Sequence, residues 1–185
     1  MIIEFLADGF EDVEALAPLD LLRRAGDEVI TVSLNDENTA TSSHNVTYTT
    51  DKKLSDLNDL AALPEMIILP GGMPGAKNLR ACPQVCGLVM NVLGNGGHIA
   101  AICAAPFILG ELGFLNGVKC TCFPGFEKKL TGGIVADTSD GGKVVTDGQF
   151  TTASGMGMAI RFGIELVSVL HGKETAEKMQ KSIMS

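Results

Sequence analysis

The chain has 185 residues, 45% of them hydrophobic, and a formal net charge of -8. This length and apolar content predict one folded domain over residues 1–185 and argue against a disordered chain. The acidic balance, the absence of Trp and the single Tyr argue against a nucleic-acid-binding protein, which needs a basic face or aromatic stacking platforms. We interpret the acidity as a solvated surface.

The first eight residues are unlike a signal peptide, because no basic segment precedes the apolar run and Glu4 and Asp8 interrupt it. No stretch of the sequence approaches the roughly 20 apolar residues that span a bilayer. We therefore expect a cytoplasmic protein with no membrane or nucleic-acid partner, whose thiols stay reduced.

Strands and helices are expected to alternate along the chain. In the first half, strands are predicted at residues 2–6, 28–34, 46–49 (within a polar stretch at 35–62) and 66–69, and helices at 11–24, ended by Gly26, and 83–93. In the second half, strands are predicted at 98–102, 118–122, 134–137, 143–146 and 149–153, and helices at 104–109, 159–170 and 173–184. This alternation predicts βαβ units, and so an α/β fold with a mostly parallel sheet covered on both faces.

Cys103 stands between the strand expected at 98–102 and the helix that follows it. Small residues surround it, namely Ala101, Ala104 and Ala105. The serine motif G-x-S-x-G needs small residues at the same offsets, because its strained turn leaves no room for side chains. A thiol at a helix start is also favoured as thiolate by the helix dipole. The sequence therefore predicts a nucleophile elbow with a reactive thiolate.

The other four cysteines do not have the paired C-x2-C spacing of zinc sites, so we expect buried structural thiols and no metal. They are Cys82, Cys86, Cys120 and Cys122.

Two further segments are candidates for chemistry. Glu11 and Glu14 share one face of the first helix, where a carboxylate contacts Cys103 if the strands before them are neighbours. Spacing alone favours the alternative, a solvated acidic first turn. Gly71 and Gly72 follow the strand at 66–69 directly, and there their amides either form an oxyanion hole or belong to a plain loop.

Together these motifs resemble the ThiJ/PfpI superfamily, and within it the branch of the Parkinsonism-associated deglycase. The residues that carry the resemblance are 5–14, 21–26, 68–79, 101–106 and 155–157. The resemblance implies a flavodoxin-like three-layer sandwich with a nucleophile elbow, and a homodimer with the first helix at the interface. It also implies a site that works without a cofactor or metal.

Residue by residue, the resemblance assigns the nucleophile to Cys103 and the glutamate that touches it to Glu14. The amides of Gly72 and Ala104 would form the oxyanion hole, and we add Glu11 and Gly71 as supporting residues. Three departures from the pattern stand out. Ala104 and Phe123 occupy places where relatives keep a histidine, and the usual Gly-Pro-Gly reads Gly-Met-Gly at 155–157.

The histidines of the chain are expected to be structural or exposed; they are His44, His98 and His171. Without a histidine base, a Cys–His triad cannot be assembled at the family positions, which argues against a peptidase or amidase. A thiolate attacks without a base, and Glu14 is expected to act as general acid and base if burial raises its pKa.

We therefore expect a stress-protection enzyme, a cysteine hydrolase or lyase like a deglycase or glyoxalase. Its substrate would be a small reactive carbonyl, either methylglyoxal or a glycated adduct. The alternative is a redox-sensing chaperone whose Cys103 oxidises to sulfinate without turnover. A peptidase or amidase is the third, disfavoured hypothesis.

Overall fold

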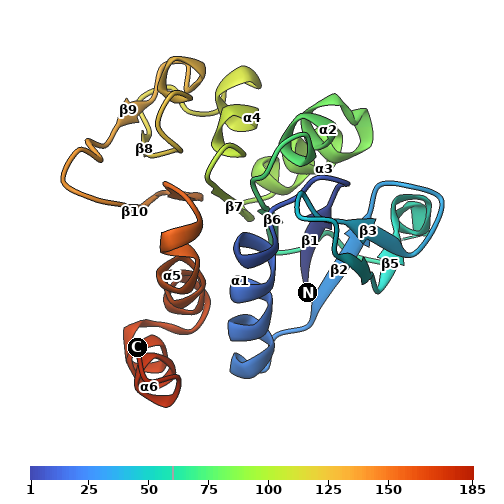
Figure 1. The fold of residues 1–185 in the computed structure, drawn as a ribbon, viewed down its shortest axis with the longest axis horizontal. Helices are drawn as coiled ribbons and strands as arrows, with labels where there is room; N and C mark the ends of the chain where they lie inside the picture. The colour runs from blue at the N-terminus through green and yellow to red at the C-terminus, as the bar shows by residue number, and fades with distance from the viewer. Residues whose placement is uncertain (60) are drawn as a thin grey trace.

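The protein is described by a computed structural model that covers residues 1–59 and 61–185 (Figure 1). Leu60, in the polar stretch expected at 35–62, lies outside the described residues. The main sheet consists of β1 (Ile2–Leu6), β2 (Val29–Ser33), β5 (Lys52–Lys53), β6 (Met66–Leu69), β7 (His98–Ile102), β10 (Val144–Asp147) and β11 (Phe150–Ala153). Their order is β10-β11-β7-β6-β1-β2-β5.

The main sheet is parallel except where β10 pairs with β11. Two small sheets flank it, an antiparallel hairpin of β3 (Thr39–Thr41) with β4 (Thr47–Thr49) and a parallel pair of β8 (Lys119–Cys120) with β9 (Ile134–Val135). The predicted mostly parallel sheet is confirmed. The strand expected at 118–122 is shorter than predicted, and β3 was not expected.

Helices cover both faces of the sheet. They are α1 (Asp12–Ala25), α2 (Gly75–Ala81), α3 (Pro83–Gly94), α4 (Pro106–Glu111), α5 (Ala159–His171) and α6 (Lys173–Ser182). Figure 1 shows α1 and α5 side by side, with α6 following at the end of α5. The predicted three-layer arrangement is confirmed; α2 was not expected as a separate helix.

Alternate side chains of β1 point to opposite faces of the sheet and pack in the two apolar clusters that lie on either side of it. Ile3 and Phe5 point to the face covered by α2, α3 and α4, and pack in one apolar cluster with side chains such as Val89. Ile2 points to the opposite face and packs with Leu22 and Phe162 of α1 and α5. A strand buried on both faces reads as a continuous apolar run, which is why β1 was predictable.

Glu4 is the exception in this strand. It shares its face with Ile2, is fully buried, and has no hydrogen-bond partner at either carboxyl oxygen. Burial raises the pKa of Glu4 well above its ordinary value, against an opposing effect of the Arg23 charge. A buried carboxyl without partners is costly to ionise, so the fold favours the protonated form of Glu4.

Candidate active site

Cys103 follows β7 directly, at the carboxyl end of a central strand. Its φ of 63° places it in the left-handed region, which costs a non-glycine residue roughly 1–2 kcal/mol. Its backbone is held on both sides, because its N–H donates to Ala153 O at 2.8 Å and its carbonyl accepts from Phe123 N at 2.8 Å. The predicted strained elbow is confirmed.

The helix after the elbow begins later than predicted. Residues 103–105 form a turn, α4 starts at Pro106, and it has six residues. The local donors to the sulfur are instead single amides: the N–H groups of Ala104 and Gly72 both interact with Cys103 and favour its charged form. The structure therefore brings both predicted oxyanion-hole amides to the sulfur.

Glycine is required at positions 71 and 72 for different reasons. Gly72 has a φ of 83°, and a Cβ there would lie 2.6 Å from Phe10 C. At Gly71 a Cβ would overlap Glu14 Oε2 and lie 2.7 Å from Cys103 Cβ. The bare backbone at Gly71 is therefore what lets the carboxyl and the thiol come together.

The site is assembled at the ends of three adjacent parallel strands. In the order β7-β6-β1, β7 leads into Cys103, β6 leads into Gly71 and Gly72, and β1 leads through a short loop to Glu14. The contact between Cys103 and Glu14 was expected only if the strands before them, β7 and β1, were direct neighbours. They are not, because β6 lies between them. Ligand sites of α/β sheets occur at this edge.

Glu14 is 1% exposed, at the start of α1. Burial raises its pKa to about 7; interaction with Cys103 opposes the rise and the Glu11 charge adds to it. Its Oε2 has no regular hydrogen-bond partner. The interpretation that spacing favoured, a solvated carboxylate, is wrong for Glu14, and the general acid–base role expected from a raised pKa has its physical basis.

Glu11 has a different place from the one its helical spacing suggested. It caps α1, since its Oε2 accepts a hydrogen bond from Glu14 N at 2.8 Å. Its own N–H donates to Gly71 O at 3.1 Å. Glu11 therefore fixes the start of α1 against the Gly71 loop, in agreement with a supporting role.

The surroundings of Cys103 do not favour the expected thiolate. Burial, and after it the charge and hydrogen bonding of Glu14, raise the pKa of Cys103 to about 12, while the Ala104 and Gly72 amides only partly offset this. Burial and the Glu14 carboxyl, whose contact with the thiol the resemblance implied, outweigh the helix-dipole effect expected from the sequence. The surroundings therefore favour a protonated Cys103 thiol beside the Glu14 carboxyl, whose pKa is raised to about 7.

Each histidine is engaged elsewhere, as expected. His98 is buried and hydrogen-bonded to Thr151 Oγ1 at 2.9 Å, and burial lowers its pKa to about 4. His171 pairs with Asp27 at 2.9 Å. His44 is exposed and contacts α1. Glu14 is accordingly the titratable group that the described residues place against the thiol.

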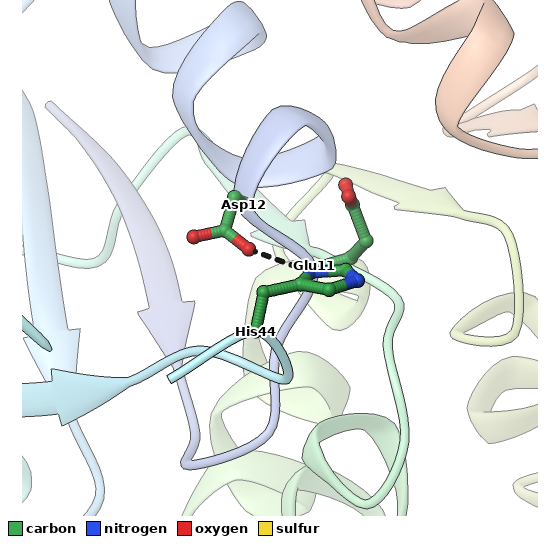
Figure 2. Close-up of side chains that lie close together, drawn as sticks. All are labelled: Glu11, Asp12 and His44. Atoms are coloured by element: carbon green, nitrogen blue, oxygen red, sulfur yellow. Dashed lines mark hydrogen bonds and ion pairs between the residues drawn. The ribbon is translucent and has the colours of Figure 1, made fainter. Parts of the chain in front are cut away.

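A second polar cluster lies just outside the site. Glu11, Asp12 and His44 have potential ligand atoms within 4.8 Å of one another. Figure 2 shows the Asp12–His44 hydrogen bond, 3.0 Å long, with the Glu11 carboxyl turned away from it. The other Asp12 oxygen accepts from Tyr48 at 2.9 Å. Because Asp12 is hydrogen-bonded to both His44 and Tyr48, it ties the β3–β4 hairpin to α1.

Sequence reasoning missed two contributors to the site. Phe123 donates its N–H to the Cys103 carbonyl, and the N–H of Met156 interacts with the Glu14 carboxyl. Both residues contact the site through backbone N–H groups, which every residue except proline has, so their side-chain types do not indicate these contacts. Only their places in the resemblance marked them, as departures from the expected histidine and proline.

A thiol on a strained strand-to-helix turn, with a carboxyl and two amides around it, defines an α/β protein with a cysteine nucleophile elbow. The chain belongs to the DJ-1/PfpI family, whose model matches residues 2–169. This confirms the resemblance found in the sequence.

Three similar proteins illustrate the match. Protein DJ-1 homolog A of Arabidopsis thaliana is 34% identical over 97% of this chain, which spans only 45% of that relative's length. The glutathione-independent glyoxalase DJR-1.2 of Caenorhabditis elegans is 29% identical over 94% of this chain and 89% of its own. The oxidized DJ-1 structure of Toxoplasma gondii superposes with a TM-score of 0.90 at 31% identity, covering 99% and 97% of the two chains.

Proposed function

We propose that the protein is a cysteine-dependent enzyme acting on small reactive carbonyls, with methylglyoxal as the simplest substrate. The observation that carries the proposal is the contact between a buried carboxyl of pKa about 7 and the Cys103 thiol. A general base is most effective when its pKa lies near the working pH. The glyoxalase name of the Caenorhabditis elegans relative supports the same class of substrate.

In the first step the Glu14 carboxylate takes the thiol proton while the sulfur bonds to the aldehyde carbon. The carbonyl oxygen gains negative charge, is stabilised by the N–H groups of Gly72 and Ala104, and is then protonated to give a hemithioacetal. The absence of a histidine is no obstacle to this step, because Glu14 supplies the base.

In the second step Glu14 removes the proton from the former aldehyde carbon and returns a proton to the neighbouring carbon. The hemithioacetal thereby becomes the thioester of a 2-hydroxy acid. Water hydrolyses the thioester, releasing lactate and the free thiol of Cys103, so the net change is the addition of one water. With a glycated amine, the sulfur would bond to the hemiaminal carbon as the carbon–nitrogen bond breaks, Glu14 would pass the thiol proton to the leaving amine, and the same hemithioacetal would result.

The test is consumption of methylglyoxal with lactate as the measured product. Cys103→Ala is expected to lose at least about 100-fold in rate, because both the addition and the proton transfer need the thiol. Cys82→Ala is the matched control, since Cys82 is also a half-buried free thiol but lies outside the site. Equal lactate production by wild type and Cys103→Ala would sink the proposal.

A second candidate function is oxidation sensing. Two amides and a protonatable carboxyl surround the Cys103 sulfur, which suits the oxygens of a sulfinate. Under this hypothesis mild peroxide converts Cys103 to sulfinate ahead of Cys82 and Cys120, measured by peptide mass analysis. If Cys103 is oxidised no faster than those two, the sensor hypothesis is abandoned; its raised pKa already argues against fast oxidation.

Within residues 1–59 and 61–185, no helix combines the length and apolar character needed to cross a bilayer. We further propose a cytoplasmic location, and a homodimer as the resemblance implies. Val13 on α1 and Ile160 on α5 are exposed apolar side chains on adjacent helices, which supports an interface there.

A further inference from the structure

An apolar pocket of about 390 Å³ lies next to the reacting pair. Phe123, Met156 and Met158 supply its large side chains, and glycines 142 and 155 leave it open. A Cβ at Gly155 would lie 3.2 Å from the Phe123 ring, and one at Gly142 would lie 2.8 Å from Met158. These two side chains therefore rest on bare backbone, and any larger residue at either glycine would displace them.

Two residues of the pocket are bonded to the site through their backbone. Phe123 donates its N–H to the Cys103 carbonyl at 2.8 Å, and the N–H of Met156 interacts with the Glu14 carboxyl. The two largest exposed walls of the pocket are thus each one backbone contact from a reacting residue. These two contacts place Phe123 and Met156 beside the reacting pair.

The apolar side chains that line the pocket disfavour a charged substituent on the substrate. Phe123 is 48% exposed and Met156 is 52% exposed, a large apolar surface to leave in water. The residues that line the pocket, all in the described part of the chain, include no charged side chain. Of the two polar ones, Thr138 and Ser154, the latter already accepts a hydrogen bond from Lys143 N. A charged substituent would lose water there without gaining a partner.

We propose that the Phe123–Met156 pocket makes the enzyme selective for 2-oxoaldehydes that carry an aromatic or other large uncharged apolar substituent. Phenylglyoxal represents this class, and the methyl group of methylglyoxal offers much less apolar surface to the walls. The inference rests on the proposed function and names its substrate class. The covalent step is unchanged: sulfur adds to the aldehyde carbon, and the ring lies against Phe123 and Met156. Both residues stand where the chain departs from the family pattern.

The first experiment compares kcat/KM for phenylglyoxal and methylglyoxal, each scaled by the rate of its addition to free glutathione. The wild type is expected to favour phenylglyoxal at least 10-fold. Phe123→Ala and Met156→Ala are expected to lower this ratio by about 10-fold, mainly through KM. Met90→Ala is the matched control, because Met90 is a methionine of similar exposure, 50%, on α3. Phe123→Leu serves if the alanine variant does not fold.

The second experiment needs no turnover. Phenacyl chloride and chloroacetone each alkylate a thiol, the sulfur–carbon bond forming as chloride leaves, and mass analysis counts the adduct on Cys103. A preference for the aromatic reagent above that of glutathione, reduced in Phe123→Ala, supports the pocket. A preference equal to that of glutathione overturns it. Retained selectivity in alkylation, without Cys103-dependent lactate or mandelate formation, would support the pocket and remove the proposed function.

Discussion

A Glu14→Gln variant is expected to lose at least about 100-fold in kcat on methylglyoxal and yet to be more stable than the wild type at pH 8. Gln keeps the shape of the side chain but takes no proton from the thiol. The wild-type rate should rise with pH through about 7 as Glu14 ionises, and the variant should lose this rise. Steady-state kinetics between pH 5.5 and 8.5 measure both effects.

The expected gain in stability follows from the same carboxyl. The folded pKa of Glu14, about 7, lies above its ordinary value of 4.5. The contribution of Glu14 to the stability of the fold is therefore fully present below pH 4.5 and is lost as the pH rises through 7. The loss lowers the free energy of unfolding by an amount on the order of 3 kcal/mol. Urea unfolding at pH 5 and pH 8 should find the variant stabilised only at the higher pH.

Glu28→Gln is the matched control for this experiment, because Glu28 is an exposed glutamate outside the site. It should change neither the rate nor the pH dependence of stability. A Glu14→Gln enzyme with the wild-type pH profile would mean that Glu14 is not the base.

Glu4→Val is expected to stabilise the protein by at least ~2 kcal/mol at pH 8, the second large effect. Val suits a buried strand, and it replaces a carboxyl with no partner at either oxygen. Because the folded pKa of Glu4 is raised well above 4.5, the wild type loses stability as the pH rises and Glu4 is forced to ionise. The stability gained by Glu4→Val should therefore grow with pH. Urea unfolding from pH 5 to pH 9 measures this.

Glu4→Gln provides the comparison, since it removes the charge but leaves a buried amide without partners. Its gain should be smaller than that of Glu4→Val at high pH. A Glu4→Val protein that is less stable than the wild type at pH 8 would contradict the assignment of Glu4 as a destabilising buried acid.

The central strands β1, β6 and β7 were predictable because each is a short, mostly apolar segment that ends at a turn signal. The missed elements have weaker patterns. Thr39–Thr41 is a short polar hairpin strand, and Gly75–Ala81 is a short helix that opens with glycine. Short segments of this composition are equally typical of an ordinary loop, so the sequence does not identify them as a strand or a helix.

The site divides in the same way. Cys103 and the Gly71–Gly72 turn were identifiable from their places after buried strands, whereas Glu14 was assigned only through the resemblance. The protonation state of Cys103 could not be predicted, because it depends on burial and on a carboxyl about 90 positions earlier in the chain. The residues next to Cys103 in the sequence do not indicate that contact.

The backbone partners of the elbow have a consequence for biosynthesis. Cys103 receives its contacts from Phe123 and Ala153, and Glu14 receives one from Met156, all later in the chain. Translation therefore places the nucleophile outside the ribosome well before the segments that hold its turn. Until residue 156 has emerged and β11 has paired with β7, the nascent chain lacks these contacts, and the elbow is completed only with the last part of the sheet.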